Sequence, residues 1–151
     1  MKSKSFICEE TLGYLVKRTG RSMSKALREQ FAAHDLELPI EHWGILVHLW
    51  RQDGRSQREL ADLVFKDKAT ITRAIAHLEK LNAVIRIPDN DDKRQNRVYL
   101  THKGRSLQSV LFPIAQSVVE MGTRGISAEE IAICRSVLQR INENLKHFIT
   151  A

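Results

Sequence analysis

The stretch that decides the fold runs from Ser56 to Gly104 and reads SQRELADLVFKDKATITRAIAHLEKLNAVIRIPDNDDKRQNRVYLTHKG. Ser56 with Glu59 three residues later is typical of a helix N-terminus, where the hydroxyl and the carboxylate satisfy free backbone amides. Asp67 is a good N-cap for a second helix over residues 68–81, because apolar residues recur there at helical spacing. The stretch therefore predicts two consecutive helices joined by a short turn.

Two runs typical of β-strands follow these helices, at residues 83–87 and 97–100. The loop between them, Pro88 to Asn96, is acidic at its start and basic further on. Two helices followed by a two-stranded hairpin form the winged helix-turn-helix plan, which suits duplex DNA because a helix fits the major groove.

The segments on either side of this module are helical in pattern. A long helix is predicted from Glu9 to Ala33, another begins after Leu38, and Thr101 and Ser127 are candidate caps for two more. The predicted fold is mostly α with a small β-hairpin wing (α+β). Its parts are an N-terminal dimerisation helix (1–37), a DNA-binding lobe (38–104) and C-terminal dimerisation helices (105–151). Dimerisation is expected because the terminal helices lack a large core of their own within one chain.

Charge and composition narrow the class of protein. A formal charge of +6 and a pI of about 9.6 favour anionic partners, with nucleic acid first and an anionic membrane surface second. No run of about 18 apolar residues and no signal-peptide pattern is present, which predicts a cytoplasmic protein without a membrane span. The two cysteines, Cys8 and Cys134, show no spacing typical of a metal site.

An enzyme is the rival class, and the sequence does not favour it. No Gly-rich phosphate loop, nucleophile elbow or His-Glu metal motif is present. The acidic cluster Asp89, Asp91 and Asp92 lies beside Lys93 and Arg94, which offset its charge. We therefore expect no catalytic residue and no cofactor. A winged-helix module that binds another protein instead of DNA is the second alternative.

The helix over residues 68–81 has one buried stripe, so its opposite side is free to contact DNA. A solvated face would more often be rich in Glu and Lys pairs, whereas small and hydroxylated residues with one long Arg let a backbone approach a groove closely. The residues on that side are Lys68, Ala69, Thr70, Thr72, Arg73, Ala76 and His77.

The quoted stretch resembles the DNA-binding core of the MarR (multiple antibiotic resistance repressor) family of bacterial transcription regulators. The wing pattern of that family is Asp, then basic residues, then Leu-Thr and a Gly, which matches Asp92, Lys93, Arg94, Leu100-Thr101 and Gly104. The similarity continues upstream in register through Leu60-Ala61, Lys68, Thr70, Thr72, Arg73, Leu78-Glu79 and Arg86. Asn82 departs from the pattern, which usually has Gly there, and Asn tolerates the same left-handed conformation.

The resemblance implies a homodimer, in which each chain presents a recognition helix to a major groove and a wing to the flanking minor groove. It implies that Arg94 enters the minor groove and that Asp92 braces it. A narrow minor groove concentrates negative potential and so attracts Arg. Phosphate contacts are expected from Lys93 and Arg97 in the wing, and from Ser56 and Gln57. For Arg97, a cross-strand charge on a solvated hairpin is the alternative.

The resemblance also implies repression and response to a signal. One candidate signal is a small aromatic or anionic effector in a cleft lined by Tyr14, Trp43 and Trp50, although aromatic residues at helical spacing are more often core. The other is oxidation of Cys8, which the neighbouring acidic residues oppose. Glu41-His42 could begin a metal site, but the sequence supplies no further His pair to complete it, so no metal is predicted.

Overall fold

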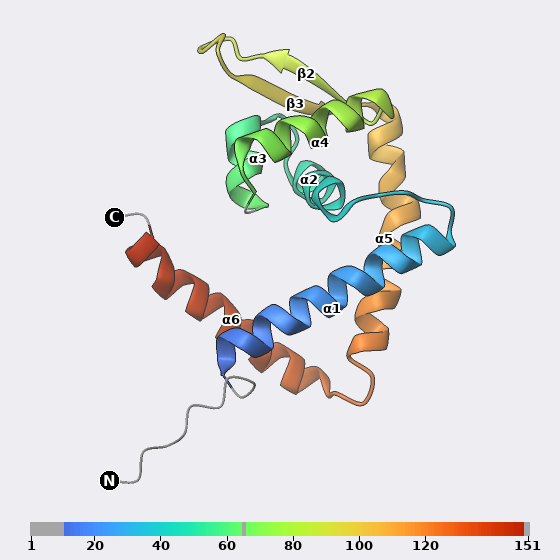
Figure 1. Ribbon diagram of the computed structural model, residues 1–151, viewed down its shortest axis with the longest axis vertical. Coiled ribbons are helices and arrows are strands. Elements are labelled where there is room, and N and C mark those ends of the chain that lie inside the picture. Colours follow the sequence, from blue (N-terminus) through green and yellow to red (C-terminus); the bar gives the residue numbers. More distant parts are fainter. Residues whose placement is uncertain (1–10, 65, 150–151) are drawn as a thin grey trace. The chain divides into compact units, whose positions relative to one another are not determined.

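The computed structural model describes residues 11–64 and 66–149 of the chain. It is mostly helical with a small antiparallel sheet, which confirms the predicted fold class (Figure 1). The described elements, in chain order, are α1 (Leu12–Ala33), α2 (Ile40–Arg51), β1 (Arg55–Ser56), α3 (Gln57–Leu63), α4 (Lys68–Lys80), β2 (Val84–Pro88), β3 (Asn96–Leu100), α5 (His102–Gly122) and α6 (Ala128–Ile149). Two compact units divide the chain, one up to Val118 and one from Val119 onward.

The predicted helix caps are confirmed. Ser56 Oγ accepts the Glu59 amide at 3.1 Å, and Asp67 Oδ1 accepts the Thr70 amide at 2.8 Å. Thr101 Oγ1 accepts the amide of Gly104 at 3.0 Å, in the first turn of α5. Each of these side chains satisfies a backbone amide that has no partner within its own helix, which fixes where the helix begins.

The sheet has three strands in the order β1-β3-β2, whereas the sequence predicted two. β2 and β3 form the expected hairpin, with Arg86 opposite Val98 and Pro88 opposite Asn96. The additional strand, β1, pairs Arg55 with Val98 and Ser56 with Arg97. A strand of two residues carries no alternating apolar pattern, so nothing in its own sequence indicates it. β1 ties the start of α3 to the wing.

The core of the first unit lies between α2, α3, α4 and the inner face of the sheet. α1 contributes Phe31 and α5 contributes Leu111 to it, and both are fully or almost fully buried. The other large side chains that are almost completely buried are Ile45, Leu46, Leu49, Leu60, Ile71, Ile75, Leu78, Val84 and Val98. This single core fixes α4 and the wing to the same support.

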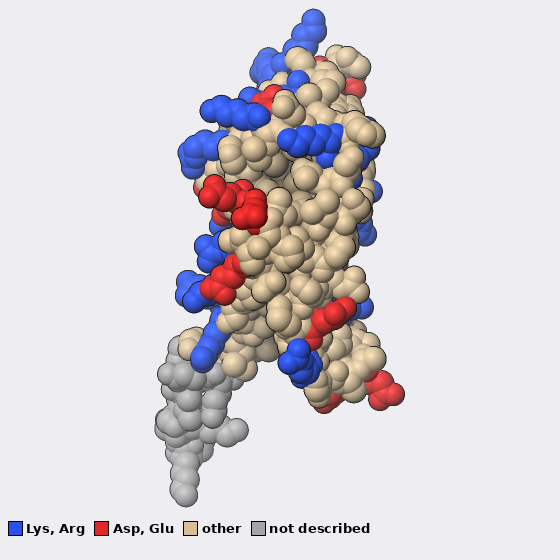
Figure 2. Space-filling model, turned by 90° about the vertical axis from the view of Figure 1, so that its right-hand side faces the viewer, with Lys and Arg blue, Asp and Glu red and all other residues tan. Residues whose placement is uncertain are grey.

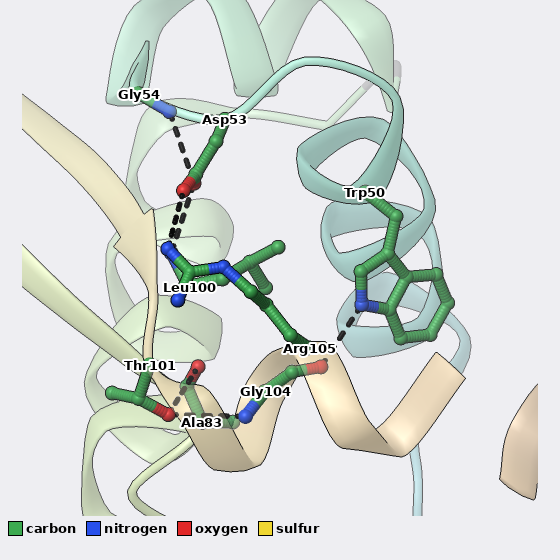
Figure 3. Close-up of polar contacts among 8 residues, drawn as sticks. All are labelled: Trp50, Asp53, Gly54, Ala83, Leu100, Thr101, Gly104 and Arg105. Carbon is green, nitrogen blue, oxygen red and sulfur yellow. Dashed lines mark hydrogen bonds and ion pairs between the residues drawn. The ribbon is translucent and has the colours of Figure 1, made fainter. Parts of the chain in front are cut away.

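The junction of wing and α5 is held by polar contacts (Figure 3). Asp53 Oδ1 accepts the amides of Gly54 at 3.0 Å and Leu100 at 2.9 Å, and its other oxygen lies 3.6 Å from Arg105. Trp50 Nε1 donates to the Gly104 carbonyl at 2.9 Å. Gly104 is required here, because a Cβ at this position would collide with the Ala83 carbonyl. These contacts connect the C-terminal end of α2 to both β3 and α5.

Asn82 ends α4 with a φ of 58°, as predicted. In the second unit, Ser127 caps α6 as predicted, and Glu130 completes a reciprocal pair with it, with amide-to-side-chain distances of 2.9 and 3.1 Å. α6 has no buried residue within the described part of the chain, and it exposes Ile133, Val137, Leu145, Phe148 and Ile149. None of the described helices is long and apolar enough to cross a membrane.

Candidate nucleic-acid interface

α4 presents the side that the sequence predicted. Ile71, Ala74, Ile75 and Leu78 face the core, which leaves Lys68, Ala69 and Arg73 exposed and Thr70 and Thr72 half-buried. The Asp67 carboxylate accepts both the amide and the hydroxyl of Thr70, at 2.8 Å each, and these hydrogen bonds lower the pKa of Asp67. Arg73 donates to Thr70 Oγ1 at 3.3 Å. The first two turns of α4 therefore hold two cations, Lys68 and Arg73, and a row of small side chains at the surface.

A cleft of about 710 Å³ lies between α3, the start of α4 and the wing. Its basic residues are Arg58, Lys66, Lys68, Arg86 and Arg94, and its acidic ones are Asp62 and Asp92. Arg86 is paired with Glu79 at 2.7 Å and Lys66 with Glu41 at 3.6 Å. No ion pair of Arg58, Lys68 or Arg94 is found in the described part of the chain. The cleft thus offers cationic groups to a phosphate backbone.

The surface at the wing end agrees with this charge distribution. In Figure 2, most of the charged side chains at the top are Lys and Arg, and this is the end at which the hairpin lies in Figure 1. The charged side chains that this view shows at the wing end are therefore mostly basic.

At the wing tip, Asp92 contacts Arg94 through the backbone. Asp92 Oδ1 accepts the Arg94 amide at 3.1 Å, and the Asp92 carbonyl accepts the Gln95 amide at 2.9 Å. The expected bracing therefore acts on the loop, and the exposed guanidinium of Arg94 extends from a fixed turn. Lys93 is exposed beside it.

Arg97 has partners within the hairpin. Its Nε lies 3.4 Å from Asp89 Oδ1, and its Nη1 donates to the Gly54 carbonyl at 2.8 Å. The ion pair with Asp89 agrees with the alternative role of Arg97, a charge paired across the hairpin. A phosphate contact by Arg97 would have to compete with both partners.

Ser56 and Gln57 differ in accessibility. Ser56 is only 4% exposed and its hydroxyl caps α3, so its position does not favour the predicted phosphate contact. Gln57 is half-buried and lines the cleft. Its Nε2 donates to Thr72 Oγ1 at 3.4 Å, and its Oε1 accepts from Asn96 Nδ2 at 3.2 Å.

His77 is exposed on α4, but one ring nitrogen faces α2. His77 Nδ1 and His42 Nε2 share a hydrogen bond of 2.7 Å, with the rings edge to face. Burial and the nearby His77 lower the pKa of His42, and Glu41 opposes this shift. Sequence spacing gave no sign of the pair, because 35 residues separate the two rings. Among the described residues, no group of three or more side chains is arranged to hold a metal.

The predicted aromatic residues only partly form a site. Trp43 contacts Phe31 at 5.6 Å, Trp50 at 5.7 Å and Phe112 at 6.2 Å between ring centroids. Phe112 was not singled out from the sequence, and within the described residues no ring contact joins Tyr14 to this cluster. A second cleft, of about 560 Å³, is lined instead by Ala32, Asp35, Leu36, Glu37, Leu38, Leu81, Lys103, Leu107 and Leu111. None of the three predicted ligand residues lines it.

Known proteins share both the sequence and this arrangement. A model of the MarR family matches residues 34–95, which contain α2, α3, α4 and most of the wing. The transcriptional regulator SarZ of Staphylococcus epidermidis is 30% identical over 129 residues, covering 84% of this chain and 81% of SarZ. The chain belongs to the MarR family. It is accordingly a winged helix-turn-helix transcription regulator that binds DNA, and the family is not one of enzymes.

Solved structures extend the similarity of this MarR-family regulator beyond residues 34–95. The transcriptional regulator PA3341 is 33% identical to this chain, with a TM-score of 0.79. The match covers 91% of this chain and 99% of PA3341. CouR from Rhodococcus jostii, solved with bound p-coumaroyl-CoA, shares the fold with a TM-score of 0.79. The two sequences are 22% identical, and the match covers 91% of this chain and 95% of CouR. The outer helices, which the sequence matched only in length and order, thus belong to the shared fold.

Proposed function

We propose that this MarR-family regulator is a repressor that binds a pseudo-palindromic operator as a homodimer. In each chain, α4 enters a major groove and the wing enters the flanking minor groove. The observation that carries the proposal is the basic cleft between α4 and the wing, since it can follow the phosphate backbone between the two grooves.

The side chains divide by what they contact. The accessible residues of α4 that read bases are Lys68, Ala69, Thr70, Thr72 and Arg73, with the outer edge of His77. Arg94 reads the minor groove, supported by the turn that Asp92 holds. Lys93 and Gln57 contribute phosphate contacts. Arg97 contributes mainly by holding the hairpin, through Asp89 and Gly54.

Dimerisation supplies the two-fold symmetry that a palindromic site requires. The apolar side chains exposed on α6 support this part of the proposal, because isolated chains rarely leave so many large apolar groups in water. The dimerisation segments are residues 1–37 and 105–151, and the DNA-binding lobe is residues 38–104.

The effector of this regulator is a small molecule with an apolar body and an anionic group. The cleft lined by Leu36, Leu38 and Leu107 supports the apolar part of this class. The anionic group would pair with Lys103, whose charge is opposed by Asp35 and Glu37 in the same wall. CouR binds p-coumaroyl-CoA, which combines an aromatic group with anionic phosphates. Release of DNA on binding such a molecule would make the repression reversible.

Substitutions on α4 test the proposed reading of bases. Thr72→Ala and Arg73→Ala should change which operator bases are preferred more than they change affinity for random duplex DNA. Competition binding against a set of single-base operator variants measures this. Uniform loss of affinity across the set would assign both residues to phosphate contacts and contradict the proposed role of α4.

A further inference from the structure

Gln57 joins the two elements that the proposed function brings to DNA. It is the first residue of α3, and its side-chain amide bonds to Thr72 in α4 and to Asn96 at the start of β3. The distances are 3.4 Å from Gln57 Nε2 to Thr72 Oγ1 and 3.2 Å from Asn96 Nδ2 to Gln57 Oε1. One side chain thus contacts both the recognition helix and the wing.

The fold places Gln57 there for two local reasons. β1 pairs Ser56 with Arg97 in antiparallel register, so the next residue, Gln57, comes opposite the preceding one, Asn96. The Ser56 hydroxyl caps α3 and fixes Gln57 in its first turn. The two-residue strand that the sequence did not reveal is therefore what brings the amide to the wing.

A second contact between α4 and the wing lies further along both elements. Glu79, near the C-terminal end of α4, pairs with Arg86 in β2 at 2.7 Å. Thr72 is close to the N-terminal end of α4, and Asn96 pairs with Pro88 at the tip end of the hairpin. Contacts at two separated points hold an angle, whereas one contact allows rotation about it. The Gln57 contact is the one nearer to Arg94.

We propose that Gln57 is a positioning residue that sets the angle between α4 and the wing, so that one duplex engages both grooves together. This inference rests on the proposed function, since it concerns DNA contacts by both elements. Gln57 is uncharged and half-buried, so its own attraction for phosphate is weaker than that of the exposed cations around the cleft. In addition to its own phosphate contact, Gln57 affects binding through Arg94 on one side and the α4 residues on the other.

The first measurement concerns the protein without DNA. Spin labels on Lys93→Cys and Lys80→Cys, with Cys8→Ser and Cys134→Ser, report the distance between wing tip and α4. Labelled chains are diluted into unlabelled ones so that only distances within one chain are recorded. Gln57→Met, which keeps the length of the side chain but removes its hydrogen bonds, should broaden the distance distribution. Gln108→Met, an exposed glutamine of α5, is the matched control and should leave the distribution unchanged.

The second measurement is a cycle of operator affinities for Arg73→Ala, Arg94→Ala and the double variant. With Gln57 present, the loss of operator affinity in the double variant should differ by about threefold or more from the product of the losses in the two single variants, as expected for coupled sites. In the Gln57→Met background, the loss in the double variant should equal that product within about twofold. Asn96→Ala removes the same contact from the wing side, and it should reproduce both results if Gln57→Met proves too unstable to study.

Two results would overturn the inference: an unchanged distance distribution in both variants, or coupling that persists without the Gln57 contact. A parent protein that selects no DNA sequence would instead contradict the proposed function. The spin-label distances would still show whether Gln57 holds the wing, so failure of one proposal is distinguishable from failure of the other.

Discussion

Arg94 is the single residue on which wing binding depends most. It is exposed, it lies on a turn held by Asp92, and no ion pair within the described residues neutralises it. Arg94→Ala should weaken operator binding by about 1–3 kcal/mol, because a minor-groove arginine contributes both charge and fit. Binding isotherms at several salt concentrations measure this, with Lys93→Ala as the neighbouring control. Equal affinity of Arg94→Ala and parent at every salt concentration would show that the wing does not enter the groove.

His42 gives the folded protein a dependence on pH. Its pKa is lowered in the folded state, first by burial, then by His77, against the opposing charge of Glu41. The unfolded chain therefore binds a proton more readily than the folded one between the lowered pKa and about 6.5, the ordinary value. In that window the free energy of unfolding rises with pH, so stability is lost as the pH falls below about 6.5.

His42→Gln should flatten this dependence while retaining a group that can bond to His77. Chemical denaturation between about pH 5 and 8 measures the slope, with the exposed His34→Gln as the control. His48, whose pKa is also lowered by burial, will keep part of the slope in every variant. An identical slope in parent and His42→Gln would show that His42 does not cause the dependence of stability on pH.

At the scale of elements, the junction between wing and α5 tolerates no side chain at Gly104. Gly104→Ala forces a Cβ against the Ala83 carbonyl and should destabilise the fold by about 1–3 kcal/mol. Gly122→Ala, on the same helix, is the matched control, because no described atom lies within 4 Å of the added Cβ. It should stabilise by about 0.5–1 kcal/mol, since alanine favours a helix. Thermal unfolding compares the two, and equal effects would contradict the close packing at Gly104.

The helix caps could be predicted from the sequence, whereas the contacts between distant elements could not. The caps at Ser56, Asp67 and Thr101 follow from local hydrogen bonding, so their residue types and spacing predicted them correctly. β1 is too short for periodicity, and its existence depends on the distant partner β3. The same limit applies to Gln57 with Asn96 and to His42 with His77, which only the folded chain brings together. Contacts between distant residues leave no signal in one sequence.

At the scale of the whole molecule, dimerisation through α6 is open to a direct test. Leu138, Ile141, Leu145 and Phe148 recur at helical spacing along one side of α6. Leu145→Glu should weaken dimerisation by on the order of tenfold or more, because it puts a charge in place of an exposed leucine that the proposed interface would cover. Arg140→Glu, an exposed position on the same helix, is the control.

Sedimentation across a range of concentrations measures this dissociation constant. A parent protein that stays monomeric throughout would refute the dimer. A dimer unaffected by Leu145→Glu would assign the interface to other residues.

If two copies of α4 and the wing read an operator symmetrically, selection of bound sequences from random duplex DNA will reveal both half-sites. We expect an enriched inverted repeat. Its half-sites should be centred about 10–10.5 base pairs apart, or a multiple of this, with A·T-rich positions where the wings lie. Recovery of no enriched motif, or of one asymmetric motif without a second half-site, would contradict this symmetric reading.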